Sequence, residues 1–118
     1  MADQEIVIYI TSANIEEAHK IADALLTERK VACVNVIPGV KSYFWWQGKR
    51  ESTPEVFLMA KSRASLFPAV VDLVKKNHSY EVPEIIALPI IAGSQDYLNW
   101  IREETKQEIS NEKKEGNR

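Results

Sequence analysis

Apolar positions in the first part of the chain follow two different periods. Residues 5–11, EIVIYIT, are rich in β-branched side chains and form a run too short for a helix, which predicts a largely buried strand. Asn14, followed three residues later by Glu17, is typical of a capping box at a helix start. Apolar residues then recur at helical spacing, at Ala18, Ile21, Ala22, Leu25 and Leu26. The pattern therefore predicts a strand and then a helix over about residues 15–29.

The next part of the chain is rich in strand-forming residues. A run from Val31, VACVNVIPGVKSYFWWQGK, is interrupted at Pro38 and Gly39, a pair that favours a bend or a bulge. The polar segment QGKRESTPE that follows is expected to be a loop, and EVFLMAKS after it to be another strand. Two strands joined in this way predict a hairpin.

The second half repeats the order of helix and strand. A helix is expected from Ser65 to about Asn77, because Pro68 is tolerated in a first helical turn and apolar residues follow it at helical spacing. The loop HSYEVPE leads into the strand IIALPII, where Pro89 favours an edge position or a bulge. Ser94 then caps a last helix, and the charged residues 110–118 are expected to fray.

These elements predict one domain, residues 1–109, in the order β-α-β-β-α-β with an extra C-terminal helix. That order is typical of the ferredoxin-like α+β fold, in which two helices cover one face of an antiparallel sheet. A chain of 118 residues is long enough to bury a single core. The other face of the sheet is left without helices of its own.

Four consecutive aromatic residues, in SYFWWQGK, change this picture. Side chains alternate across a strand, so Tyr43 and Trp45 are expected on one face, with Phe44 and Trp46 on the other. Helices on one side of a sheet cannot cover both sets, and an exposed apolar patch usually marks an interface. The run therefore predicts self-association; the alternative is that both sets pack inside one twisted domain.

Composition excludes several classes of partner and location. The formal net charge is -2, so no extended basic surface is expected for nucleic acid or an anionic membrane. The single cysteine cannot form an intramolecular disulfide, and the first residues lack the pattern of a signal peptide. No apolar run reaches the roughly 20 residues needed to span a bilayer. We expect a cytoplasmic protein.

Several motifs together resemble one known family. The segments ACVNVIPGV, YFWWQGK, HSYEVPEI and YLNWI, in this order, resemble the CutA family of divalent-cation tolerance proteins. The resemblance implies a ferredoxin-like protomer, a tight homotrimer arranged like the PII signalling proteins, and a role in tolerance of divalent cations, copper above all. Ser79 stands where the family usually has proline, and ESTPE is a diluted form of the family's acidic cluster. Both departures lie near proposed metal sites of the family.

The metal-ligand candidates are His78, Glu81, Glu84 and Cys33, with His19 as a weaker one. Imidazole, thiolate and carboxylate ligands together suit Cu(II), Zn(II) or Cu(I). Paired Cys and His spacings are missing, so the sequence favours a site between protomers over one within a protomer. The alternatives are that His78 and Glu81 fix their loop and that Cys33 is a small buried hydrophobe.

Other chemistry has weaker support in the residues. No credible catalytic set exists, so the protein is expected not to be an enzyme and to need no obligatory cofactor. Lys49 beside Gly48, together with Lys61, could hold a small anion in a trimer cleft next to Tyr80, although no glycine-rich phosphate loop is present. The alternative function is therefore a PII-like sensor of a small anionic metabolite, or a protein-binding adaptor, with no direct metal role.

Overall fold

The sheet forms the centre of the molecule. The computed structural model describes residues 3–106 of the chain. Its four strands are β1 (Glu5–Ser12), β2 (Cys33–Trp46), β3 (Lys49–Arg63) and β4 (Ile85–Pro89). They lie in the order β2-β3-β1-β4, and every neighbouring pair is antiparallel. This arrangement confirms the predicted ferredoxin-like α+β fold, and β4, which ends at Pro89, is an edge strand as expected.

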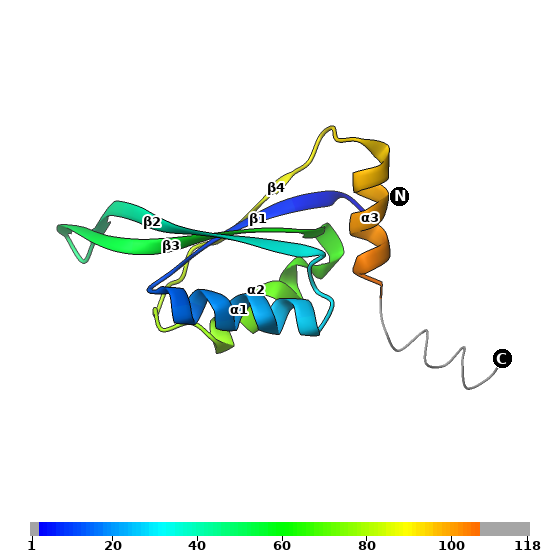
Figure 1. Cartoon of the computed structure of the whole chain (residues 1–118). Coiled ribbons are helices and arrows are strands. Elements are labelled where there is room, and N and C mark those ends of the chain that lie inside the picture. The colour runs from blue at the N-terminus through cyan, green and yellow to red at the C-terminus, as the bar shows by residue number, and fades with distance from the viewer. Residues whose placement is uncertain (1–2, 107–118) are drawn as a thin grey trace.

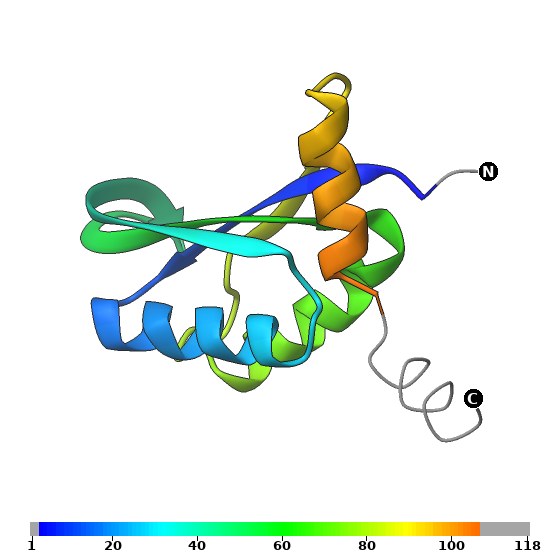
Figure 2. The same ribbon diagram turned by 45° about the vertical axis from the view of Figure 1, so that its right-hand side comes forward.

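Two helices cover one face of this sheet. Helix α1 (Ile15–Thr27) and helix α2 (Phe67–Lys76) lie side by side beneath it, and the short turn η1 (Ala64–Leu66) leads into α2 (Figure 1, Figure 2). The last helix, α3 (Gln95–Glu104), stands at the end of the sheet where β1 begins. No helix within residues 3–106 combines the length and the hydropathy needed to cross a membrane.

The core lies between the sheet and the two covering helices. Alternate residues of β1 and β3 point into it and meet the apolar stripes of α1 and α2, as the two periods in the sequence predict. Its fully or nearly fully buried side chains are Ile6, Ile8, Ile10, Ala18, Ile21, Leu25, Val31, Val56, Leu58, Ala60, Val70 and Val74.

Local signals set the ends of α1. The Asn14 side chain accepts a hydrogen bond from the Glu17 amide at 2.8 Å, as predicted, but the Glu17 carboxylate reaches back to the Ala13 amide instead of that of Asn14. The helix ends at Thr27, two residues earlier than expected, because Arg29 has a φ of 55° and turns the chain out of the helix.

The hairpin between β2 and β3 is much longer than predicted. The expectation of a loop over QGKRESTPE is wrong: the turn consists of Gln47 and Gly48 alone, and β3 begins at Lys49. Both turn residues have positive φ, 52° and 80°, which suits a two-residue hairpin turn. Because β1 ends opposite Val56, residues 38–55 form a two-stranded arm that projects beyond the sheet (Figure 1).

A β-bulge lies at the base of this arm. The register shifts between the pairs Ile37–Phe57 and Val40–Glu55, and Gly39 between them has a φ of 86°. The bulge predicted at Pro38 and Gly39 is therefore confirmed. One extra residue in β2 reverses which of its residues face each side. Even-numbered residues of β2 face the core before the bulge, and the side away from α1 and α2 after it.

The aromatic side chains of the arm alternate as expected. Tyr43 and Trp45 are 71% and 70% exposed, whereas Phe44 and Trp46, on the opposite side, are 40% and 41% exposed. Neither pair is buried within the chain, so the alternative that all four pack inside one domain is wrong for residues 3–106.

The sheet face opposite α1 and α2, called here the open face, is largely apolar. Tyr9 and Phe57 pack on it with their ring centroids 5.1 Å apart. Cross-strand pairing extends this surface from β3 to the edge strand β4, where Ile86 and Leu88 are 48% and 39% exposed. Its apolar side chains are Val7, Tyr9, Ile37, Phe57, Met59, Ile86 and Leu88. Residues 3–106 thus leave a large apolar surface uncovered.

Candidate functional site

A groove of about 890 Å³ lies between the arm and the loop that joins α2 to β4. The arm brings its aromatic run to one wall, and the loop residues 80–84 form the other. The lining residues are Thr11, Ser42, Tyr43, Phe44, Trp45, Trp46, Thr53, Glu55, Tyr80, Glu81, Val82, Pro83 and Glu84. This set includes three carboxylates and no lysine, arginine or histidine, so the groove is acidic.

His78 precedes the groove-lining part of this loop, and its imidazole points into the protein. Its side chain is fully buried. Nε2 lies 2.6 Å from the carbonyl oxygen of Thr11, and Nδ1 accepts a hydrogen bond from the Tyr80 amide at 3.1 Å. Both ring nitrogens are already engaged in holding the loop. This geometry corresponds to the structural role and leaves no lone pair for a metal ion.

Glu17 of α1 is a partner that sequence reasoning did not identify for this loop. Its Oε1 accepts a hydrogen bond from the Ser79 amide at 2.9 Å, and its Oε2 accepts one from Ala13 and lies 3.5 Å from Nδ1 of His78. Burial acts to raise the pKa of Glu17, but the hydrogen bonds from Ala13 and Ser79 and the nearby imidazole outweigh it and lower that pKa. One carboxylate thus both caps α1 and anchors the loop.

Tyr80 and Glu55 connect the loop to the arm. The Tyr80 hydroxyl donates a hydrogen bond to Glu55 Oε2 at 2.7 Å, and the Ser42 hydroxyl donates to Oε1 at 2.5 Å. Burial and the adjacent Glu55 carboxylate raise the pKa of Tyr80 to about 12. Tyr80 lines the groove, as expected of a residue at a ligand cleft. Glu55 is a buried carboxylate that sequence reasoning did not identify.

Glu81 and Glu84 are the exposed carboxylates of the groove. Both side chains line it from the loop. His78 and Cys33, the other two predicted metal ligands, are not among the residues that line the groove. Within residues 3–106, no three His, Cys, Asp or Glu side chains gather closely enough to hold a metal ion. The groove therefore offers two accessible carboxylates, and residues 3–106 hold no complete metal centre.

The remaining candidates lie elsewhere. Cys33 and Lys61 are directly opposite each other, at the end of β2 and β3 far from the arm tip. The Cys33 sulfur is 3.6 Å from the Tyr97 hydroxyl. Lys61 donates a hydrogen bond to the Asn35 side chain at 2.5 Å. Lys49 pairs with Trp46 at the tip of the arm. His19 is exposed on α1, on its solvated side as expected. The structure thus divides the predicted set among separate places.

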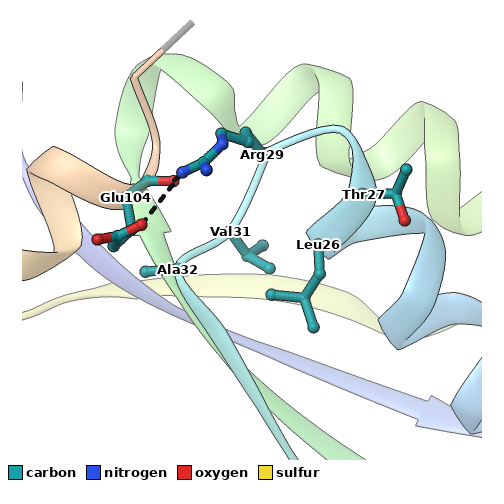
Figure 3. Close-up of a pocket in the computed structure, with 6 residues that line it drawn as sticks. All are labelled: Leu26, Thr27, Arg29, Val31, Ala32 and Glu104. Atoms are coloured by element: carbon teal, nitrogen blue, oxygen red, sulfur yellow. Dashed lines mark hydrogen bonds and ion pairs between the residues drawn. The ribbon is translucent and has the colours of Figure 1, made fainter. Parts of the chain in front are cut away.

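A second hollow, of about 430 Å³, lies near the ends of α1 and α3 (Figure 3). Arg29 donates from Nη1 to the carbonyl oxygen and to Oε1 of Glu104, both at 3.1 Å, and this contact lies along one side of the hollow. Its lining residues are Leu26, Thr27, Arg29, Val31, Ala32 and Glu104. None of the predicted site residues is among them.

The fold and the groove define a class of protein: a ferredoxin-like chain with an uncovered sheet face, a projecting two-stranded arm and an acidic groove between arm and loop. The chain belongs to the CutA1 divalent ion tolerance protein family, whose model matches residues 6–104. That match spans nearly all the described residues and confirms the resemblance that the motifs carried.

Relatives from a plant, a bacterium and an archaeon illustrate this membership. The chain is 43% identical over 102 residues to "Protein CutA 1, chloroplastic" of rice, Oryza sativa, covering 86% of this chain and 58% of the rice protein. A solved divalent cation tolerance protein from Thermus thermophilus is 45% identical with a TM-score of 0.84, and covers 86% of this chain and 99% of its own. One from Archaeoglobus fulgidus, called periplasmic, is 44% identical with a TM-score of 0.83, at 86% and 99% coverage.

These names bear on location and on activity. The chain spans only somewhat more than half the length of the rice relative. The relatives named include a chloroplastic and a periplasmic protein, so a cytoplasmic location for this chain stays a prediction. None of the three names denotes an enzyme.

Proposed function

We propose that this protein acts in divalent-cation tolerance as a cytoplasmic homotrimer that binds a divalent cation, such as Cu(II), between protomers, and that it catalyses no reaction. The observation that carries the proposal is the groove itself. It presents carboxylates without a compensating cation, beside an apolar surface that the protomer leaves uncovered. Relatives of this chain carry the description "divalent cation tolerance protein", which supports the same ligand class.

The open face and the arm support the proposed assembly. Aromatic rings that are 40–71% exposed on both sides of the arm form a surface typical of a subunit interface. The outer edges of β2 and β4 carry no neighbouring strand in the sheet. Two different surfaces of one chain make a heterologous contact, and such a contact closes into a ring when the rotation permits. A three-membered ring of this kind has the arrangement of the PII signalling proteins.

The cation site is incomplete in one protomer. Both oxygens of Glu55 already accept hydrogen bonds, whereas Glu81 and Glu84 make no side-chain hydrogen bond or ion pair within residues 3–106. Cu(II) and Zn(II) take about four ligands in protein sites. Glu81 and Glu84 therefore need further ligands, which supports a site that a neighbouring protomer completes.

The groove argues against the alternative of an anionic metabolite at the same place. An anion there would meet three carboxylates and no lysine or arginine. Lys49 and Lys61, the cations considered for it, lie at the arm tip and at the far end of the sheet. The charge of the groove thus favours the cation.

Light scattering and calorimetry test the two parts separately. We expect a mass about three times that of the 13.4 kDa chain, and saturable binding of Cu(II) or Zn(II) by protein stripped of metal. The double variant Glu81→Gln/Glu84→Gln should lose this binding, whereas Glu16→Gln, at an exposed site on α1, should retain it. A stable monomer contradicts the assembly, and binding that survives in the double variant contradicts the site.

A further inference from the structure

The tautomer of His78 is determined by its two partners. The carbonyl oxygen of Thr11 can only accept a hydrogen bond, so Nε2 must carry a hydrogen to donate across 2.6 Å. The Tyr80 amide can only donate, so Nδ1, which is 3.1 Å away, must be without a hydrogen. The loop conformation in this structure therefore requires a neutral imidazole with its hydrogen on Nε2.

Titratable and charged groups approach this imidazole from few directions. From α1 comes Glu17, whose Oε2 is 3.5 Å from Nδ1. From the loop comes the Tyr80 ring, with its centroid 4.8 Å from that of His78, and the Tyr80 hydroxyl is bound in turn to Glu55 of β3. From β1 the ring is met by the backbone carbonyl of Thr11. Glu17 is thus the anion nearest to Nδ1.

A proton added at Nδ1 changes which partner this atom can bind. The new N–H faces the Tyr80 amide, a second donor, so that hydrogen bond is lost. The Glu17 carboxylate is near enough to take its place, and its lowered pKa keeps it ionised in weakly acidic solution. Protonation therefore exchanges a contact that holds the loop for an ion pair with α1.

This exchange affects both walls of the groove. Residues 80–84 form one wall, and the Tyr80 amide, which loses its hydrogen bond to His78, belongs to that wall. The Tyr80 hydroxyl carries the displacement to Glu55, and through Glu55 to Ser42 in the arm. The imidazole thus lies at one end of a continuous chain of polar contacts that ends in the arm.

We propose that His78 is a pH-sensitive clamp: the neutral ring holds the 78–84 loop against β1 and the arm, and protonation releases Tyr80 and loosens the wall of the groove. The clamp involves only contacts within one protomer, so it does not depend on whether the groove binds a metal ion.

NMR of the full-length protein, free of metal, tests the clamp directly. The chain has only two histidines, and exposed His19 provides an internal reference. At pH 8 the ring of His78 should show the Nε2–H form. As His78 takes up its proton, the exchange protection of the Tyr80 amide, corrected for intrinsic rate, should fall about tenfold, the loss expected for one hydrogen bond.

Three variants keep the test decisive. In His78→Gln the pH dependence of Tyr80 protection should disappear. If that variant does not fold, Glu17→Gln serves instead, because it removes the ionised carboxylate that would bind a protonated Nδ1, and Tyr80 protection should then change less over the same pH range. Trp45 and Trp46 line the groove, so tryptophan fluorescence of the unmodified protein should change as His78 takes up its proton. In Tyr80→Phe the amide should still respond, but this fluorescence change should be absent because the link to Glu55 is missing. An Nδ1–H form at pH 8, unchanged Tyr80 protection when His78 titrates, or global unfolding before His78 titrates would overturn the proposal.

Discussion

The Tyr80 hydroxyl donates a 2.7 Å hydrogen bond to Glu55, and this bond joins the loop after α2 to the base of the arm. Glu55 is 7% exposed, and its other oxygen is held by Ser42. We expect Tyr80→Phe to lower the free energy of unfolding by about 1 kcal/mol, because a largely buried carboxylate loses one of its two side-chain donors. Urea denaturation measures this change.

A double-mutant cycle with Ser42→Ala separates the two donors. The double variant should lose more unfolding free energy than the two single variants lose together, because Glu55 then keeps no side-chain partner. Additive losses would mean that solvent or the backbone replaces the missing hydroxyls, and the bond would not fix the arm.

Tyr80 and Tyr97 should ionise later than ordinary tyrosines. Burial, with a hydrogen bond to Glu55 in one case and to Cys33 in the other, raises the pKa of each to about 12. In the unfolded chain both titrate near 10. The stability that each contributes is therefore fully present below about pH 10 and is lost as the pH rises toward 12. Ultraviolet titration should show fewer late-ionising phenols in Tyr80→Phe and in Tyr97→Phe; an unchanged curve would contradict the assigned environment.

Glu17 should contribute to stability with the opposite pH dependence. Its pKa is lowered in the folded protein, so its contribution is present above about pH 4.5, the value for an unperturbed carboxyl, and is lost as the pH falls through the folded value. We expect Glu17→Gln to destabilise the protein at pH 7 by about 1–2 kcal/mol and to flatten the acid side of the stability curve. The exposed neighbour Glu16→Gln is the matched control, and equal effects of the two substitutions would argue against the anchoring role.

The fold could be predicted from the sequence because most elements carry their own period and their own caps. The arm is the exception. Residues 49–54 lie in a two-stranded ribbon with solvent near both sides, so no apolar face marks them as a strand. Their pairing is set from outside the segment, by the turn at Gln47 and Gly48 and by the partner strand β2.

The site was only partly predictable for a related reason. Tyr80, Glu81 and Glu84 lie close together in the sequence, and the loop brings them to the groove together. Glu17 and Glu55 reach the same loop from 62 and 25 residues away, through contacts that local spacing does not reveal. His78 was a reasonable ligand candidate by residue type, and only the positions of Thr11 and the Tyr80 amide assign its ring to the interior.

Gly39 allows the last prediction, which concerns the bulge that orients the aromatic run. Its φ of 86° is unfavourable for any residue with a Cβ, while an added Cβ would meet no atom within 4 Å. The cost of Gly39→Ala is therefore conformational, about 1–2 kcal/mol, and Gly39→Asn should cost less because asparagine tolerates positive φ better.

If the variant keeps the bulge, denaturation shows this order and Trp45 and Trp46 fluorescence is unchanged. If the chain escapes the strain by losing the bulge, Phe44 and Trp46 exchange sides with Tyr43 and Trp45, and the change in tryptophan emission reports it. Equal stability of Gly39→Ala and the unmodified protein, with unchanged emission, would contradict the strained conformation assigned to this position.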